Sequence, residues 1–173
     1  MSDRDSPRRD GIGRTAMRFL AFLLVMVSLG SSVLTAGELK TLRVLCYNLH
    51  YGQGTDGRYD IPRLAAVIRD AKPDLVALQE VDVGVARSSR IHEAKELAKL
   101  TNMAVRFGPT QHYQGGLYGN AVLSKLPIED VHIQPLPYSE SDQTRTTYPR
   151  GAIAVKVRLA SGKLIQFIST HFQ

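Results

Sequence analysis

Residues 73–82 are PDLVALQEVD, and this segment is the best guide to the architecture because it predicts a buried strand followed by a carboxylate. Residues 75–78 form a short apolar run of the length that buried strands have. Gln79 and Glu80 follow the run, so the strand would carry the side chain of Glu80 at its C-terminal end. Desolvation of an unpaired carboxylate is costly, so Glu80 needs a partner there, either a basic side chain or a metal ion.

The residues before this strand predict another strand and a helix. Residues 42–47 (LRVLCY) predict a mostly apolar strand buried on both faces, in which Cys46 is a small core residue. After a glycine-punctuated loop, Asp60 is suited to cap a helix that has Pro62 in its first turn and ends at residues 72–74. The apolar residues of this helix recur at helical spacing on one face: Ile61, Leu64, Ala65 and Ile68.

The residues after Glu80 predict a polar loop at 82–89, a second helix and then mainly strands. The core side of the second helix would carry four apolar residues: Ile91, Ala94, Leu97 and Ala98. Strands are predicted at residues 104–107, 117–124 and 128–136, and a polar surface loop at 139–147. Two final strands, at 151–159 and 164–170, flank an Ala-Ser-Gly-Lys turn that is typical of a hairpin. This order of elements predicts an α/β fold with helices outside a sheet.

Composition places the chain among ordinary globular proteins. It has 173 residues, is 43% hydrophobic and 22% charged, and contains 14 glycines and 8 prolines, which argues against a disordered chain or a coiled coil. The formal net charge is +6, of which residues 1–37 account for five Arg and three Asp, leaving +4 for the remainder. This mild excess suits a polyanionic partner, although a solvated basic face is the commoner explanation of such an excess.

The N-terminus has the pattern of a secretory signal peptide. Residues 19–29 are apolar apart from Ser28, Arg14 and Arg18 precede them, and small residues follow up to Gly37. We therefore expect residues 1–37 to be a signal peptide and the mature protein to be exported, either to the periplasm or out of the cell. Met17 starts a tidier signal peptide than Met1 does, so the true start could be there. An uncleaved membrane anchor is the alternative, although the apolar centre is shorter than a spanning helix needs.

Four polar side chains lie where the predicted strands begin or end. Asn48 and Glu80 follow two of them, Arg150 precedes a third, and His171 follows the last. Strand ends in α/β sheets are where functional sites collect, because the sheet holds side chains rigidly while the loops leave a cleft. Each residue also has a structural interpretation: Asn48 could cap a turn, His171 could be a hydrogen-bonded structural histidine, and Arg150 a surface charge.

Five segments taken together resemble the endonuclease/exonuclease/phosphatase superfamily. They are residues 42–52 (LRVLCYNLHYG), 73–82 (PDLVALQEVD), 119–128 (GNAVLSKLPI), Arg150-Gly151 followed by a strand, and 169–172 (STHF). They occur in the order found in that family. The resemblance implies an α/β fold, with residues 38–173 as the N-terminal portion of a four-layer αββα sandwich whose mixed, mostly antiparallel sheets carry outer helices.

The resemblance also implies a chemistry, the hydrolysis of phosphodiesters or phosphomonoesters with Mg²⁺ or Mn²⁺. Carried over residue by residue, Glu80 is the metal ligand, and Asn48 helps to position the metal and the phosphate. His171 matches the histidine that contacts the scissile phosphate or takes part in proton transfer. Arg87 and Arg150 are further candidates for phosphate contacts, on the grounds of loop position and charge.

In the family, the water-activating aspartate, its neighbouring asparagine and a final aspartate–histidine pair follow the Thr-His segment, whereas this sequence ends at Gln173. We therefore expect residues 38–173 alone to be inactive or nearly so. The alternative to a hydrolase is a non-catalytic exported fragment that binds phosphate-bearing ligands. The substrate stays open among nucleic acids, phospholipid head groups and small phosphodiesters, because a fold does not fix a function.

Overall fold

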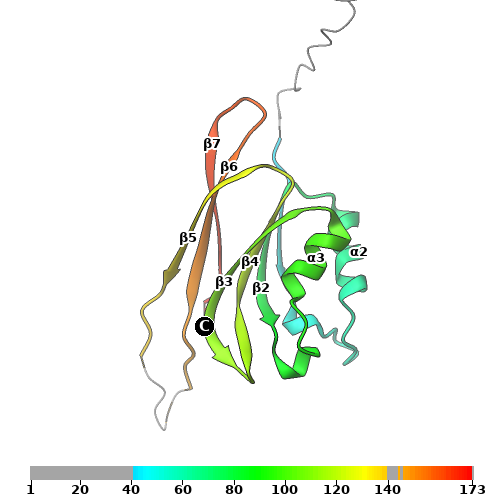
Figure 1. The fold of residues 1–173 in the computed structure, drawn as a ribbon, viewed down its shortest axis with the longest axis vertical. Helices are drawn as coiled ribbons and strands as arrows, with labels where there is room; N and C mark the ends of the chain where they lie inside the picture. The colour runs from blue at the N-terminus through cyan, green and yellow to red at the C-terminus, as the bar shows by residue number, and fades with distance from the viewer. Residues whose placement is uncertain (1–40, 140–143, 145, 173) are drawn as a thin grey trace, which may run out of the picture. The chain divides into compact units, whose positions relative to one another are not determined.

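The central strand of the structure is the one that the segment 73–82 predicts. The computed structural model describes residues 41–139, 144 and 146–172; the predicted signal peptide lies outside these residues. Within them, two sheets pack face to face, and both α-helices lie on the outer side of the first sheet (Figure 1). No helix in these ranges has the length and apolarity to cross a membrane.

The first sheet has the strand order β1-β2-β4-β3 and is mixed. Strand β1 (Val44–Asn48) pairs in parallel with β2 (Leu75–Val83), and β2 pairs in antiparallel with β4 (Gly116–Ser124). Strand β3 (Ala104–Tyr113) pairs with β4, and the two are joined by Gln114 and Gly115, both at positive φ. This two-residue turn matches the twist of the strands that it connects.

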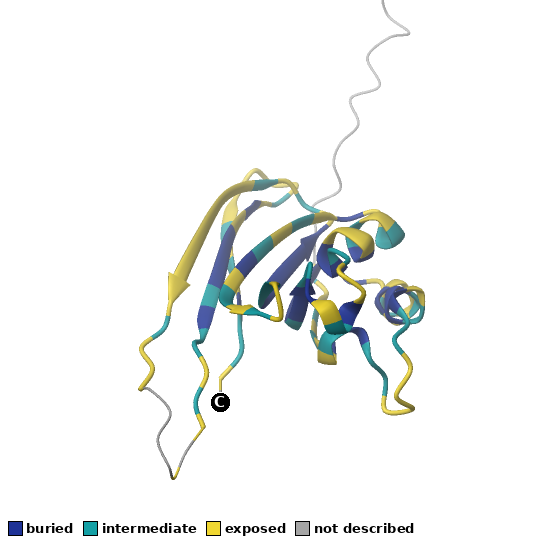
Figure 2. Ribbon diagram, turned by 60° about the horizontal axis from the view of Figure 1, so that its bottom comes forward, coloured by how far each residue is buried: buried dark blue, intermediate teal, exposed yellow. Residues whose placement is uncertain are grey.

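Two helices cover the outer face of the first sheet, as the sequence predicts. Helix α2 (Ile61–Ala71) begins at Asp60, whose side chain accepts a hydrogen bond from the backbone nitrogen of Arg63 at 2.9 Å. Its four predicted apolar residues are all buried. Helix α3 (Glu93–Thr101) buries Ala94 and Leu97. Figure 2 shows the buried side of each helix turned toward the sheet.

The second sheet has the order β5-β6-β7 and is antiparallel throughout. Strand β5 (Ile128–Pro135) lies beside β6 (Gly151–Arg158), and β6 forms the predicted hairpin with β7 (Leu164–Thr170). The predicted loop at 139–147 lies partly outside the described residues.

The core consists of two apolar clusters, one on each side of the first sheet. The first cluster joins α2 and α3 to the sheet and includes Leu64, Ile68, Leu78 and Leu97. The second joins the two sheets through a separate set of residues: Leu75, Val122, Ile153, Val155 and Val157. The architecture is therefore mixed α/β with two facing sheets and outer helices, which confirms the predicted fold class.

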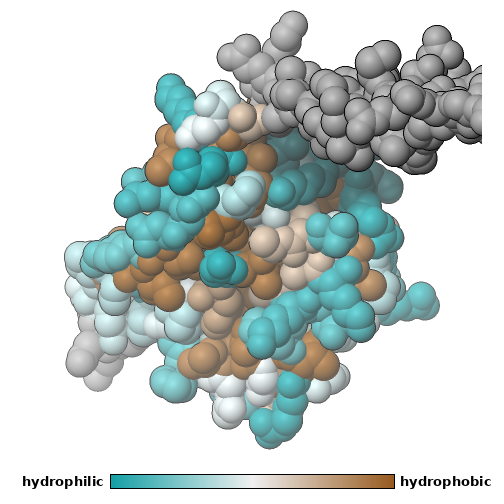
Figure 3. Space-filling view, turned by 45° about the horizontal axis from the view of Figure 1, so that its top comes forward, coloured by the Kyte–Doolittle hydropathy of each residue, from teal (hydrophilic) through white to brown (hydrophobic). Residues whose placement is uncertain are grey.

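Strand β1 departs from its prediction. It was expected to be buried on both faces, yet only one side packs against the first cluster, while Val44 is 50% exposed and Cys46 is also exposed. The reason is that β1 is the edge strand of the first sheet, while the described strands of the second sheet pack mainly on β2, β3 and β4, so the face of β1 that carries Val44 and Cys46 is left uncovered there. The second sheet also leaves Leu164 and Ile168 exposed. Figure 3 shows apolar surface gathered on one face of the molecule within a polar border.

Candidate active site

A bulge in the middle of β2 places Glu80 in the site. The pairing of β2 with β4 is regular up to Leu78 and resumes at Val81, and Glu80 between them has a φ of 57°. The prediction that the strand ends at Glu80 was therefore wrong, since β2 continues to Val83. A bulge re-aims one side chain without ending the strand. A left-handed φ is also unfavourable for a non-glycine residue, and such strain collects at functional sites.

Asn48, the last residue of β1, fixes the orientation of this carboxylate. Its side-chain Nδ2 donates a hydrogen bond to Glu80 Oε1 at 2.9 Å, and its Oδ1 accepts one from the backbone nitrogen of His50 at 2.9 Å. The contact exists because β1 and β2 are parallel neighbours in register, with Asn48 opposite Gln79. Asn48 thus both caps the following turn, as its structural interpretation predicts, and holds the candidate metal ligand.

The turn after Asn48 is strained and turns two ring side chains toward the site. His50 has a φ of 47° and Tyr51 a φ of 45°, values that bulky residues rarely adopt. Both rings line the cavity beside Glu80. Together with Glu80, they make three non-glycine residues with left-handed φ around one cavity, which is the distribution expected when a fold stores strain at a functional site.

The second sheet contributes Arg150, just before β6, and His171, just after β7. Arg150 Nη1 lies 3.3 Å from His171 Nδ1, and His171 Nε2 lies 3.9 Å from Glu80 Oε1. Because a guanidinium can only donate, Nδ1 must accept, which leaves the imidazole proton on Nε2. Burial lowers the pKa of His171, the charge of Arg150 lowers it further, and Glu80 opposes both. The ring is therefore neutral at pH 7.

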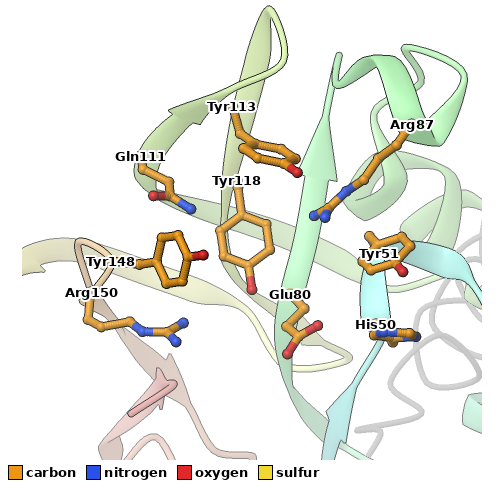
Figure 4. A pocket seen from close by; sticks show the side chains of 9 residues that line it. All are labelled: His50, Tyr51, Glu80, Arg87, Gln111, Tyr113, Tyr118, Tyr148 and Arg150. Carbon is orange, nitrogen blue, oxygen red and sulfur yellow. The ribbon is translucent and has the colours of Figure 1, made fainter. Parts of the chain in front are cut away.

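A cavity of about 330 Å³ opens beside Glu80 and is rich in aromatic rings (Figure 4). Tyr118 from β4 stands in the middle of its wall, with its hydroxyl directed toward Glu80. Burial, together with the charge of Glu80, raises the pKa of Tyr118 to about 12, against the opposing effect of Arg150. The hydroxyl therefore stays protonated and can donate a hydrogen bond. The full lining is His50, Tyr51, Glu80, Arg87, Gln111, Tyr113, Tyr118, Tyr148 and Arg150.

Arg87 lines the same cavity, but its charge is already matched. Its Nε and Nη2 donate to the two carboxylate oxygens of Asp82 at 2.8 and 3.0 Å, and the Asp82 side chain is fully buried. The sequence placed Asp82 in a polar loop, whereas it belongs to β2. Arg87 is thus held as one half of a bidentate ion pair, so Arg150 is the better placed of the two predicted phosphate contacts.

Glu93 is a buried carboxylate that contacts the backbone of Asp82. It is fully buried, and its Oε2 accepts a hydrogen bond from the backbone nitrogen of Asp82 at 2.8 Å, whereas Oε1 is buried without a hydrogen-bond partner among the described residues. Burial, reinforced by the charge of Asp82, raises the pKa of Glu93 to about 7, although the Asp82 N–H lowers it. The burial of Glu93 could not be predicted from the sequence, because it resembles an ordinary charged residue at a helix start.

The structure therefore brings together Asn48, Glu80, Arg150 and His171, the four polar residues that the sequence predicts at strand ends. Among known proteins, the sequence model of the endonuclease/exonuclease/phosphatase family matches residues 45–162. The chain belongs to the endonuclease/exonuclease/phosphatase family.

The chain is also similar to individual proteins. The Escherichia coli (strain K12) protein YbhP is 27% identical over 140 residues, which cover 76% of this chain and 53% of YbhP. An endonuclease/exonuclease/phosphatase from Beutenbergia cavernae DSM 12333 has a TM-score of 0.59 at 27% identity, covering 76% of this chain and 38% of that one. A family protein from Leptotrichia buccalis C-1013-b gives 0.61 at 19% identity, covering 77% and 55%. The chain thus spans about half the length of these similar proteins.

The site fits a magnesium or manganese ion through few protein ligands. Within the described ranges, no group of three or more His, Cys, Asp and Glu side chains lies close enough together to hold a metal. Glu80 is the carboxylate that enters the cavity, and it is fixed by Asn48. Magnesium typically takes one or two carboxylates, keeps several waters and binds substrate phosphate, so a lone oriented glutamate suits it.

Proposed function

We propose that this chain carries the metal- and phosphate-binding part of a metal-dependent phosphoester hydrolase. The observation that carries the proposal is the convergence of Glu80 from one sheet and Arg150 from the other on one cavity. Family membership supports hydrolysis of a phosphoester as the reaction. The carboxylate suits a cation and the guanidinium suits a phosphate oxygen, so the two can bind a metal and a phosphate side by side.

The division of labour among the residues follows from their contacts. Glu80 would hold Mg²⁺ or Mn²⁺, with Asn48 keeping its carboxylate in place. The bound ion would supply positive charge that stabilises the phosphate oxygens as negative charge develops on them. Arg150 would donate to the same phosphate, and its Nε is buried without a hydrogen-bond partner among the described residues. The neutral His171, which lies beside Arg150 and has its proton on Nε2, would donate a further hydrogen bond to that phosphate.

Export is part of the same proposal. The pattern of residues 1–37 supports a signal peptide, and a periplasmic or secreted protein would meet phosphate esters outside the cytoplasm. Fractionation of cells that express a C-terminally tagged chain tests it. A shortened product in the periplasm or medium supports cleavage, whereas full-length material in the membrane supports the uncleaved anchor instead.

Metal binding is the direct test of the site. We expect Glu80→Gln to weaken Mn²⁺ binding at least tenfold, because the variant removes the charged ligand and keeps its shape. Water-proton relaxation or electron paramagnetic resonance would measure the dissociation constant. Glu96→Gln, a change at an exposed position on α3, is the matched control and should bind like the parent. Equal Mn²⁺ affinity for all three proteins would refute Glu80 as the ligand.

An activity assay distinguishes a hydrolase from a non-catalytic fragment that only binds phosphate-bearing ligands. The purified chain would be assayed with bis(p-nitrophenyl) phosphate and p-nitrophenyl phosphate in the presence of Mg²⁺ or Mn²⁺. Metal-dependent hydrolysis that Glu80→Gln abolishes would show that this chain alone is a catalyst, against our expectation for residues 38–173. Metal and phosphate binding without turnover would support a binding role for the isolated chain.

A further inference from the structure

The cavity beside Glu80 has a wall made of rings. Four of its nine lining residues are tyrosines, namely Tyr51, Tyr113, Tyr118 and Tyr148, and none of the nine is aliphatic. A pocket for an acyl chain would be lined by aliphatic side chains, because burial of apolar surface drives such binding. Tyrosines instead offer flat aromatic faces together with polar hydroxyls. The lining therefore favours a ligand that is both flat and polar.

Three of the four rings, those of Tyr51, Tyr113 and Tyr118, are held by one guanidinium before any ligand binds. The guanidinium carbon of Arg87 lies 3.9 Å from the centroid of the Tyr51 ring, 4.6 Å from that of Tyr113 and 5.6 Å from that of Tyr118. Asp82 holds this guanidinium through two hydrogen bonds and is itself buried. Cation–π contacts of this kind attract the rings to one point. Rings held in this way lose little freedom on binding, which strengthens affinity.

The charges divide the cavity into two ends. Because Asp82 neutralises Arg87, the cationic group available to a phosphate is Arg150, which lies at the end of the cavity near Glu80 (Figure 4). Tyr118 stands between that end and Arg87. A phosphate bound at Arg150 would thus have its ester group directed along the tyrosine wall. The cavity of about 330 Å³ falls within the range of small-molecule sites.

On the basis of the proposed function, we infer that the substrate is a phosphate ester of a ring-bearing polar alcohol, with the ring stacked on the tyrosine wall around Tyr118. A nucleoside and a sugar both meet this description. Stacking of a base on an aromatic side chain is tolerant of the identity of the base, since every base has a π-face, and a sugar ring can pack its C–H face on the same surface. An acyclic polar phosphate ester would bind by its phosphate alone and would gain nothing from the wall.

The test compares three phosphate monoesters on the full chain in the presence of Mg²⁺, with affinities taken from NMR titrations. The probes are adenosine 5′-monophosphate, glucose 6-phosphate and glycerol 3-phosphate, which share the phosphate and differ in the ring. We expect at least one ring-bearing ester to bind five- to tenfold more tightly than glycerol 3-phosphate, and the preferred one identifies a nucleoside or a sugar. Equal binding of all three would overturn the inference while supporting the proposed function. Binding of none would overturn both.

Variants of Tyr118 test whether the preference for a ring-bearing ester depends on this side chain. Tyr118→Phe keeps the ring and should retain the preference, whereas Tyr118→Leu should reduce it to within twofold of glycerol 3-phosphate. Tyr138→Leu, at an exposed tyrosine outside this cavity, is the matched control and should behave like the parent. A dispersed amide spectrum of each variant checks the fold. If Tyr118→Leu keeps the preference, or if Tyr118→Phe loses it, stacking on this ring is refuted.

Discussion

At the scale of single residues, buried charge near the cavity gives the protein a measurable dependence on pH. Glu93 is fully buried beneath Asp82, and one of its carboxylate oxygens has no hydrogen-bond partner among the residues that the structure describes. Burial raises its pKa from a usual value near 4.5 to about 7. Between these two values, the unfolded chain releases the proton while the folded chain keeps it. The free energy of unfolding must therefore fall as the pH rises through this window.

We predict that Glu93→Gln removes this loss. By linkage, ionisation of Glu93 costs about 3 kcal/mol of stability by pH 8 relative to pH 5, and the neutral glutamine avoids it. Glutamine also keeps an oxygen that can accept from the Asp82 backbone nitrogen. Urea unfolding at pH 5 and pH 8 would measure the difference. Glu96→Gln serves as the control on the same helix, and an unchanged pH dependence in Glu93→Gln would contradict the assignment.

At the scale of single elements, the start of helix α2 is set by its N-cap residue, Asp60. Asp60 accepts a hydrogen bond from the Arg63 backbone nitrogen at 2.9 Å, which satisfies one of the donors that every helix leaves unpaired at its start. We predict that Asp60→Ala lowers the free energy of unfolding by about 1 kcal/mol, whereas Asp60→Asn is nearly neutral because asparagine caps equally well. Urea unfolding midpoints of the two variants check this. An equal loss in both would mean that charge, and not capping, is the source of the effect.

The helices and most strands could be predicted from the sequence because their apolar periodicity is strong. Strand β3 was predicted at residues 104–107 but extends to Tyr113, past Gly108 and Pro109, two residues that usually weaken strands. That error hid part of the tyrosine wall, because Tyr113 lies in the extension. Asn48, Arg150 and His171 lie at or next to strand ends, as predicted.

The bulge at Glu80 could not be predicted from the sequence, because the residue with the positive φ is a glutamate and not a glycine. The tyrosine wall was equally hidden, since Tyr51 is far in the chain from Tyr113 and Tyr118. Only the fold brings them to Arg87. Asp82 was also misplaced, because a charged residue after a short apolar run has the appearance of a loop residue even when an arginine pairs with it in the interior.

At the scale of the whole molecule, stability and site geometry depend on the same interface between the sheets. Glu80 comes from the first sheet, and Arg150 and His171 flank strands of the second. Polar contacts also cross between them: Asn120 Nδ2 donates to the Gly151 carbonyl at 2.9 Å, next to Arg150. The relative position of the two halves of the site is therefore set by how the sheets pack.

We predict that Ile153→Ala, in the fully buried cluster between the sheets, lowers the free energy of unfolding by about 2–5 kcal/mol. Because the site spans this interface, the variant should also weaken Mn²⁺-dependent binding of inorganic phosphate. Urea unfolding and a phosphate titration monitored by NMR are the measurements. Val131→Ala, at a half-exposed position on the neighbouring strand β5, should cost much less. Phosphate affinity that is unaffected in a destabilised Ile153→Ala protein would show that the two sheets position the site independently of their packing.

The exposure of β1 has a practical consequence. Cys46 is the single cysteine of the 173-residue sequence, and its thiol lies on the exposed face of that strand, two residues before Asn48. One maleimide or nitroxide reagent would therefore attach at one known place. A spectroscopic probe at that thiol would sense what happens at Glu80 from the outside, without any engineered attachment point.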